Sequence, residues 1–280
     1  MSDTTESQIA RLAVTSVVLS LLLLAGATPI AAQQPGPLPI DKPSDTVEFF
    51  PRYTFQIGGN TLSGDDTRFM SDAHYGGATD LIDYTVPFKG RINIVADYEA
   101  VLGTEYRIFD PNQSIYILEG SGSFWLGKNE IAGVFHHISR HLSDRPKNYG
   151  IAFNSVGVRY LRLFDVGGGT SVAVSGRLAK VIAKADVDYT WESGFAVTLR
   201  HVLKPHMGVF AHGWGDMFAV DPVLRGRTAQ HGGRFEGGVR FDGRGGALEV
   251  YGGVEHRLDA DPHDYLPLTW AIFGFRLMSK

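Results

Sequence analysis

The sequence predicts an all-β fold, a transmembrane antiparallel up-and-down β-barrel of about 12 strands. Alternation of apolar and polar residues recurs over stretches of about 9–15 residues, which suits a tilted membrane strand better than a soluble one. Aromatic residues cluster near the ends of these stretches, as in the girdles of membrane barrels. The last stretch, Leu268 to Met278, is aromatic and alternating, and only Ser279 and Lys280 follow it.

Composition narrows the alternatives. A mean hydropathy of −0.05 excludes a multi-helix membrane protein. The net charge of −4 gives no basic stripe for nucleic acid, and the absence of Cys excludes disulfides, thiolate metal sites and a Cys nucleophile. A soluble β-sandwich would show similar alternation and stays open as an alternative.

The first 32 residues are interpreted as a secretory signal peptide. Leu12 to Ala25 is uncharged and follows Arg11, and small residues up to Ala32 offer a cleavage site. An uncleaved membrane anchor is the alternative. Residues 33–44 are Pro-rich and predicted to be a flexible mature N-terminus, and residues 45–280 form the barrel.

Strand candidates follow one another without a convincing amphipathic helix after Asp45. In the clearest one, Val187, Tyr189 and Trp191 lie opposite polar residues. The candidates cover residues 46–58, 78–88, 91–103, 114–126, 129–142, 149–164, 170–179, 181–192, 194–204, 207–219, 229–241, 246–258 and 264–278. These are thirteen segments, whereas single-chain bacterial barrels have even strand numbers. We therefore predict 12 strands, with the error in the first segment or in the division of 170–192.

One candidate strand, residues 129–142, carries the most chemistry. His137, Ser139 and His141 lie on one face of it. Cβ atoms two residues apart on one strand face are about 6–7 Å apart, so His137 and Ser139 could form a hydrogen bond after modest side-chain rotation. The imidazole could then take the hydroxyl proton during attack on an ester.

His137-Ile-Ser139 resembles the catalytic pair of the outer-membrane lipid A 3-O-deacylases. The resemblance implies His137 as base and Ser139 as nucleophile. That family orients its His with a downstream Glu and has Asn after the Ser. Here Arg140 follows the Ser, no Glu lies between Arg140 and Trp191, and Asp144 is the nearby downstream acid.

The longer segment His137-Ile-Ser-Arg-His-Leu-Ser-Asp144 is also similar to the His-x-Ser-x-His-Leu-x-Asp segment of an outer-membrane barrel family of uncharacterised function. In that family an Asn/Tyr-containing strand with Val-Arg follows, here Tyr149 to Tyr160. A short aromatic hairpin ends it, here Ala247 to Leu277. This resemblance implies a bacterial outer-membrane location and a barrel fold, and no activity.

Three interpretations of the polar cluster stay open. The first is a structural network lining the lumen, since barrel interiors hold polar residues that satisfy one another. The second is an ester hydrolase with His137, Ser139 and Asp144. The third is ligand binding, with His141 and Arg159 as candidates. His137 and His141 lie about 13 Å apart along the strand, too far to share a metal ion, so no metal site is predicted.

The other motifs in the sequence do not indicate a specific function. Gly122-Ser-Phe-Trp-Leu-Gly-Lys128 has the spacing of a phosphate loop, but Asn129 replaces the required Ser or Thr, and it is expected to be a hairpin turn. No cofactor is expected. Inward charges are predicted at five arginines, whose pairing with acids would decide any anion preference: Arg52, Arg91, Arg159, Arg177 and Arg200.

The sequence thus predicts an outer-membrane barrel with a polar lumen, a small-solute pore or binding barrel. The alternative is an acyl ester hydrolase that acts on lipid A or phospholipid. The expected partners are outer-membrane lipid or lipopolysaccharide and, during biogenesis, the barrel-assembly machinery. The hydrolase requires His137 and Ser139 to face the outer leaflet or to open onto it through a groove, with an acid within hydrogen-bond reach of His137.

Overall fold

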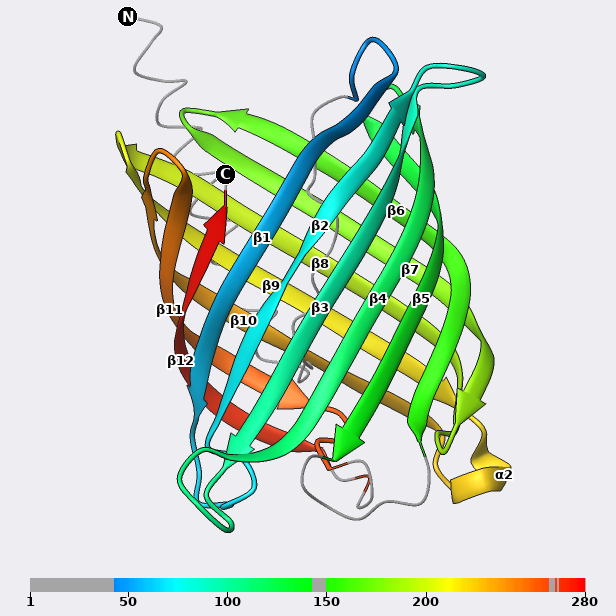
Figure 1. The fold of residues 1–280 in the computed structure, drawn as a ribbon, viewed down its shortest axis with the longest axis vertical. Coiled ribbons are helices and arrows are strands. Elements are labelled where there is room, and N and C mark those ends of the chain that lie inside the picture. The colour runs from blue at the N-terminus through cyan, green and yellow to red at the C-terminus, as the bar shows by residue number, and fades with distance from the viewer. Residues whose placement is uncertain (1–42, 143–149, 262–264, 266, 280) are drawn as a thin grey trace, which may run out of the picture.

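The chain forms a closed barrel of twelve antiparallel strands in a computed structural model, in which each strand pairs with its neighbours in sequence and β1 pairs with β12 (Figure 1). The structure describes residues 43–142, 150–261, 265 and 267–279. The strands are β1 (Glu48–Leu62), β2 (Ser71–Tyr84), β3 (Gly90–Gly103), β4 (Asp110–Leu126), β5 (Asn129–Leu142), β6 (Ile151–Gly167), β7 (Thr170–Ala185), β8 (Tyr189–Lys204), β9 (Met207–Val220), β10 (Ala229–Asp242), β11 (Gly246–Arg257) and β12 (Leu268–Ser279).

The predicted fold class and strand number are confirmed. The surplus candidate came from residues 170–204, where the three predicted segments are the two long strands β7 and β8. Strand β2 begins seven residues earlier than predicted, at Ser71 instead of residue 78. Its first half, with Asp72, His74 and two glycines, lacks the apolar alternation on which the prediction depended. The predicted signal peptide and nearly all of the flexible N-terminus lie outside the described residues.

Polarity is inverted relative to a soluble protein. Large apolar side chains cover the outside, with Phe273 63% exposed, whereas charged side chains fill the inside, with Arg234 0% exposed. Only a barrel surrounded by lipid gains from this arrangement, because apolar surface outside meets hydrocarbon and the inward charges pair with one another. The only helix of the described chain is the four-residue α2 (Pro222–Arg225), and no helix there has the length and hydropathy needed to cross a membrane.

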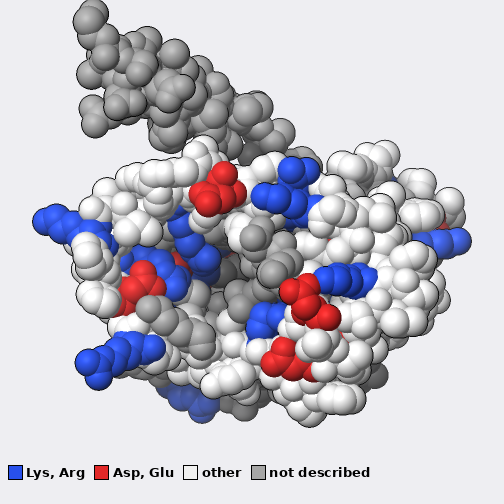
Figure 2. All heavy atoms as spheres, turned by 90° about the horizontal axis from the view of Figure 1, so that it is seen from above, with Lys and Arg blue, Asp and Glu red and all other residues white. Residues whose placement is uncertain are grey.

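The two ends of the barrel differ. One end, the turn end, has the start of β1, the end of β12 and the connections 85–89, 127–128, 168–169, 205–206 and 243–245. Seen from this end, acidic and basic side chains mix around the rim and inside it (Figure 2). The other end, the loop end, has the connections 63–70, 104–109, 143–150, 186–188, 221–228 and 258–267. β5 runs from the turn end to the loop end (Figure 1).

Ion pairs fill most of the interior, and the five arginines predicted to face inward belong to this network. Arg91 binds Asp80 and Glu130 at 3.0 and 2.8 Å, and Arg177 contacts Glu119 and Glu192 at 3.3 and 3.5 Å. Arg52 pairs with Asp80 and Asp83, Arg159 with Glu119, and Arg200 with Glu249. Because these cations have acidic partners, the lumen has no strong preference for anions.

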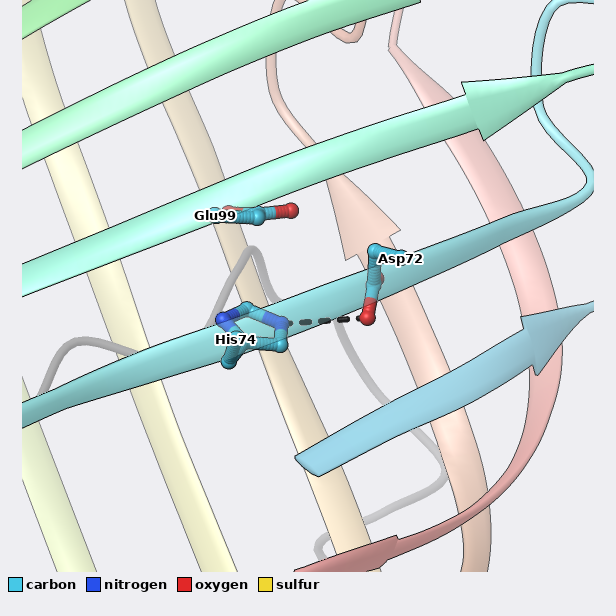
Figure 3. A group of neighbouring side chains, drawn as sticks. All are labelled: Asp72, His74 and Glu99. Atoms are coloured by element: carbon cyan, nitrogen blue, oxygen red, sulfur yellow. Dashed lines mark hydrogen bonds and ion pairs between the residues drawn. The ribbon is translucent and has the colours of Figure 1, made fainter. Parts of the chain in front are cut away.

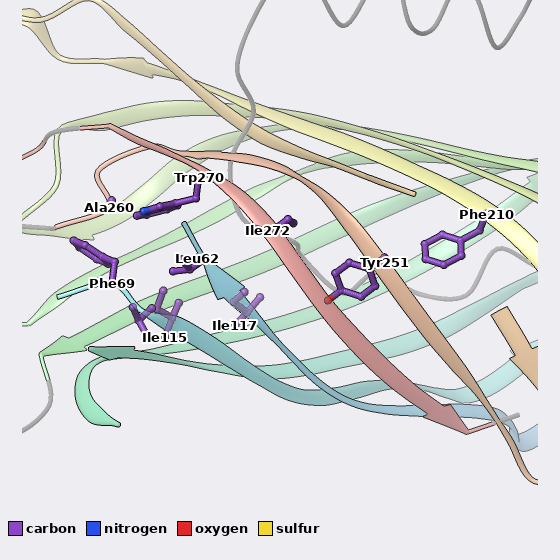
Figure 4. Close-up of a cluster of buried hydrophobic side chains, with 10 residues drawn as sticks. Leu62, Phe69, Ile115, Ile117, Phe210, Tyr251, Ala260, Trp270 and Ile272 are labelled. Atoms are coloured by element: carbon purple, nitrogen blue, oxygen red, sulfur yellow. The ribbon is translucent and has the colours of Figure 1, made fainter. Parts of the chain in front are cut away.

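An apolar cluster closes the interior toward the loop end (Figure 4). Phe69, from the β1–β2 connection, packs against Trp270 of β12 with ring centroids 5.4 Å apart. Ala260, from the β11–β12 connection, is completely buried in the same cluster. A second cluster around Phe153, Tyr189 and Phe218 includes Leu258 from the same connection. The described parts of these two connections therefore fold into the mouth of the barrel, where they bury apolar side chains.

Candidate functional site

The face of β5 that carries His137, Ser139 and His141 points outward, toward lipid. The inward face consists of Glu130, Ala132, Val134, His136, Ile138, Arg140 and Leu142, and its first four members are almost fully buried. On the outward face Phe135 is 47% exposed, His137 and Ser139 are half-buried, and His141 is exposed. The expectation of a lumen lining was therefore wrong. The two-residue period correctly placed the three residues on one face of the strand. The lumen interpretation of that face relied only on their polarity, which does not fix the direction in which the face points.

His137 has a specific partner across the strand pair. Asn154 of β6 stands directly opposite it, and its Oδ1 lies 2.6 Å from His137 Nδ1. An amide oxygen only accepts hydrogen bonds. The Nδ1–H of His137 therefore donates the hydrogen bond, and Asn154 Oδ1 accepts it. The other ring nitrogen, Nε2, is then left with a lone pair and can act as a base.

Ser139 lies two residues beyond His137 on the same outward face, between Tyr116 of β4 and Ala152 of β6. Same-face positions of a strand bring a hydroxyl and an imidazole within reach of each other after side-chain rotation. The hydroxyl, the imidazole and the amide therefore follow one another along two adjacent strands. A serine, a histidine and a hydrogen-bond acceptor for the imidazole are the types of group that serine hydrolases use.

A row of aromatic rings on the outside of the barrel crosses β2, β3 and β4 in register and leads to Ser139 on β5. Tyr75, Tyr98 and Tyr116 lie on consecutive strands, with ring centroids 4.9 and 5.1 Å apart. His141 continues the row, edge-on to Tyr116 at 5.3 Å. In membrane proteins, Tyr and Trp are enriched where the membrane changes from hydrocarbon to headgroups.

The other predicted site residues, Asp144 and Arg159, are not found beside His137 and Ser139 in the described structure. Asp144, proposed as the acid of the hydrolase alternative, lies outside the described residues. Arg159 points into the barrel, where it pairs with Glu119 and donates to Ser121 Oγ at 2.9 Å. It does not share a face with His141, which points outward. The structure thus places His137 and Ser139 on the same outward face and leaves Arg159 inside.

Asn154 was not predicted from the sequence as a partner of His137. Its signal was present, because Asn154 shares a strand face with Val156, Val158 and Tyr160, which are outward and exposed. A lone amide on an apolar strand face is unusual where that face meets lipid. An acid was expected as the partner of His137, so the sequence did not single out the amide of Asn154.

A second His-containing group lies directly behind the first, on the lumen side. His136 and Ser155 stand opposite each other on β5 and β6. Glu192 of β8 lies 3.0 Å from His136 Nδ1 and accepts a hydrogen bond of 2.6 Å from Ser155 Oγ. All three are almost completely buried. Ser155 donates to the carboxylate and not to the imidazole, so this group is a structural network.

Asp72 and His74 of β2 and Glu99 of β3 form a third group inside the barrel, with ligand atoms within 4.8 Å of one another (Figure 3). Their spacing would suit a metal ion. However, Arg257 contacts Asp72 at 3.2 Å and Glu99 at 2.6 Å. The guanidinium supplies the positive charge that a metal ion would otherwise bring, so the group is part of the ion-pair network.

No protein-family model matches the sequence, and a search of curated proteins finds no match. Among solved structures, the chain is similar to outer membrane phospholipase A from Escherichia coli. The TM-score is 0.51 and the identity 10%, covering 83% of this chain and 98% of that chain. It is also similar to Omp33 of Acinetobacter baumannii (TM-score 0.36, 12% identity, 81% and 98% covered) and to OmpT of Vibrio cholerae (0.38, 10%, 83% and 96%).

The likeness to the Escherichia coli protein shows the fold. The protein is an outer-membrane β-barrel, as the sequence predicted. Outer-membrane barrels have short periplasmic turns and longer extracellular loops, so the turn end faces the periplasm and the loop end faces the outside. His137 and Ser139 lie in the half of β5 nearer the loop end, and therefore beside the outer leaflet. The two resemblances drawn from the His-x-Ser segment remain predictions.

Proposed function

We propose that this protein is an outer-membrane lipid acyl-ester hydrolase that acts on lipids of the outer leaflet. Ser139 is the nucleophile, His137 the general base and Asn154 the acceptor that orients His137. The observation that carries the proposal is the 2.6 Å contact between His137 and Asn154 on the lipid-facing side of the barrel. A hydrogen-bonded imidazole beside a serine has little structural purpose in contact with lipid.

The reaction follows from the geometry. Ser139 Oγ attacks the ester carbonyl while His137 Nε2 takes the hydroxyl proton, and Asn154 Oδ1 holds the imidazole by its Nδ1–H. The ester C–O bond breaks, and the leaving alcohol receives the proton from His137. Water then attacks the acyl group on Ser139, again with His137 as base. The products are a fatty acid and a deacylated lipid, and Ser139 regains its hydroxyl.

The depth of the site supports a lipid substrate. Ser139 lies opposite Tyr116, a member of this aromatic row, and aromatic side chains of this kind are enriched at the interface between headgroups and hydrocarbon. The ester bonds of a glycerolipid or of lipid A lie at this same interface. The similar fold from Escherichia coli is named a phospholipase, which agrees with an ester-linked lipid as substrate.

A solute pore has less support. The connections fill the extracellular mouth with side chains such as Phe69 and Ala260, which are 1% and 0% exposed. Deeper in the lumen, charged residues are paired with one another. A pore needs a continuous water-filled path, and the described residues crowd the interior instead.

The test is fatty-acid release by the full-length barrel in mixed micelles of phospholipid and detergent, with lipid A as a second substrate. We expect release from at least one of the two, and a fall of about 10³-fold or more for Ser139→Ala. The matched control is Ser193→Ala on β8, whose hydroxyl also lies on the outward face near the loop end. Its activity should equal that of the wild type.

A fluorophosphonate probe gives a second measurement, because it labels an activated serine without a lipid substrate. We expect labelling of Ser139 that is lost in His137→Ala. A wild-type barrel that neither releases fatty acid nor reacts with the probe would overturn the proposal, as would equal activity of Ser139→Ala and wild type.

A further inference from the structure

Ser139 lies where the support of its strand weakens. The pairing of β5 with β6 ends at Arg140 opposite Ile151, one position beyond Ser139. From there to Leu142, the pairing of β5 that involves described residues is with β4 alone. A nucleophile loses much of its rate when displaced by about 1 Å, so the end of this strand needs another anchor.

Arg140 is the residue after Ser139 and points to the opposite side, into the barrel mouth. Its Nη1 donates to the backbone oxygen of Asp259 at 2.6 Å. Its Nη2 donates to the backbone oxygen of Ala260 at 3.3 Å and to Gln113 Oε1 at 3.2 Å. Gln113 also donates to Ala260 at 2.7 Å, so β4 and β5 hold the same piece of backbone.

That piece belongs to the segment Leu258–Asp261 after β11, which we call the strap. The strap is buried although it lies in a connection, with Asp259 2% and Ala260 0% exposed. On its far side Tyr189 donates to Asp259 Oδ2 at 2.5 Å, and Arg227 donates to both carboxylate oxygens at 2.8 and 2.9 Å. Asp259 has a left-handed backbone, with φ 45°.

Arg140 depends on the strap for its hydrogen-bond acceptors. Within the described chain, the guanidinium of Arg140 has no carboxylate within ion-pair distance, and its three acceptors are neutral oxygens. Loss of such acceptors destabilises a partly buried cation, so Arg140 and the strap hold each other in place.

We infer that Arg140 is a positioning residue for Ser139, which it aligns by fastening the end of β5 to the strap across the extracellular mouth. The inference rests on the proposed hydrolase function. It means that the activity on the outside of the barrel depends on a loop inside the mouth. Displacing the strap, by mutation or by a ligand at the mouth, lowers the turnover of lipid without touching the lipid-binding surface.

The experiment compares Arg140→Met and Arg140→Lys with the wild type by kcat, KM and the rate of fluorophosphonate labelling. We expect kcat and the labelling rate of Arg140→Met to fall about 10- to 100-fold with KM within twofold, because alignment is lost and lipid contact is kept. Arg140→Lys keeps the charge and should recover part of the rate. Tyr189→Phe loosens the strap from the other side, and its labelling rate should fall several-fold.

The matched control is Arg159→Met, another buried inward arginine of the same strand pair but nearer the turn end. It should lower resistance to unfolding and leave kcat unchanged. Wild-type kcat and labelling in both Arg140→Met and Tyr189→Phe would overturn the inference, as would an equal loss of kcat in Arg159→Met. If Arg140→Met does not fold, Arg140→Lys and Tyr189→Phe decide. An inactive wild type would refute the hydrolase itself, which is a distinct result.

Discussion

The two faces of the β5–β6 pair carry similar side chains in opposite environments. Outside, His137 faces Asn154, and Ser139 follows. Inside, one residue back on β5, His136 faces Ser155, and both contact Glu192. The inner group has a histidine, a serine and an acid, and by residue types alone it looks more like a catalytic triad than the outer group.

The environments explain why the outer group has an amide where a carboxylate would be expected. Inside the barrel, the charge of Glu192 is balanced by Arg177, whose Nε lies 3.5 Å away. On the outside, a carboxylate would face lipid without a cation, which costs several kcal/mol. An amide oxygen accepts the same hydrogen bond from His137 without a charge. An amide on the lipid face therefore suits the orienting role that we propose for Asn154.

Exchanging each histidine for alanine tests this comparison with the largest expected effect. His137→Ala removes the base, so we expect kcat/KM for lipid hydrolysis to fall about 10³- to 10⁴-fold, while unfolding in urea changes little. His136→Ala breaks the inner network, so it should lower the free energy of unfolding and leave kcat/KM within several-fold of the wild type. The reverse pattern would assign the chemistry to the inner group.

The orienting amide gives the next largest effect. Asn154→Ala leaves His137 free to rotate and to change tautomer, so we expect kcat to fall about 10²-fold at nearly constant KM. Asn154→Gln keeps the acceptor on a longer side chain and should retain more activity than Asn154→Ala. Initial rates in mixed micelles measure both. If Asn154→Ala keeps the full kcat, the 2.6 Å contact has no catalytic role.

The same comparison shows what the sequence could and could not predict. Period-two alternation identified the strands, and the even-number rule removed one surplus segment, which the structure places in residues 170–204. The face of His137 was misassigned because His and Ser were counted as lumen residues by polarity. Neighbouring Phe135 and the run Val156, Val158 and Tyr160 carried the correct signal, since a lipid-facing strand side is apolar.

Contacts between distant parts of the chain were beyond the sequence. The strap meets Arg140 across more than a hundred residues, and Glu192 reaches β5 from β8, three strands away around the barrel. Neither contact has a local pattern, because each depends on how the barrel closes and how a connection folds into its mouth. The pairing of His137 with Asn154 depends on hairpin register, which boundary errors of about 2–4 residues obscure.

Glu192→Gln tests the inner group with a moderate effect on stability. The amide keeps the shape and can still accept from Ser155, but it loses the charge that faces Arg177 and the charge-assisted hydrogen bonds. We expect the free energy of unfolding to fall by about 2 kcal/mol, measured by urea unfolding in lipid vesicles. Lipid hydrolysis should stay at the wild-type rate. A large loss of activity at full stability would connect the inner network to the chemistry.

The smallest expected effect belongs to Ser155→Ala, the inner counterpart of Ser139→Ala. The substitution removes one hydrogen bond of 2.6 Å to Glu192, which keeps its contact with His136 and its proximity to Arg177. Because the carboxylate keeps these partners, we expect a loss of only about 1 kcal/mol in the free energy of unfolding. Fluorophosphonate labelling should remain complete, since a buried serine that donates to an acid has no base to activate it. If Ser155→Ala abolished labelling while Ser139→Ala retained it, the nucleophile would lie in the lumen, and the outward pair would be no more than a feature of the lipid-facing surface.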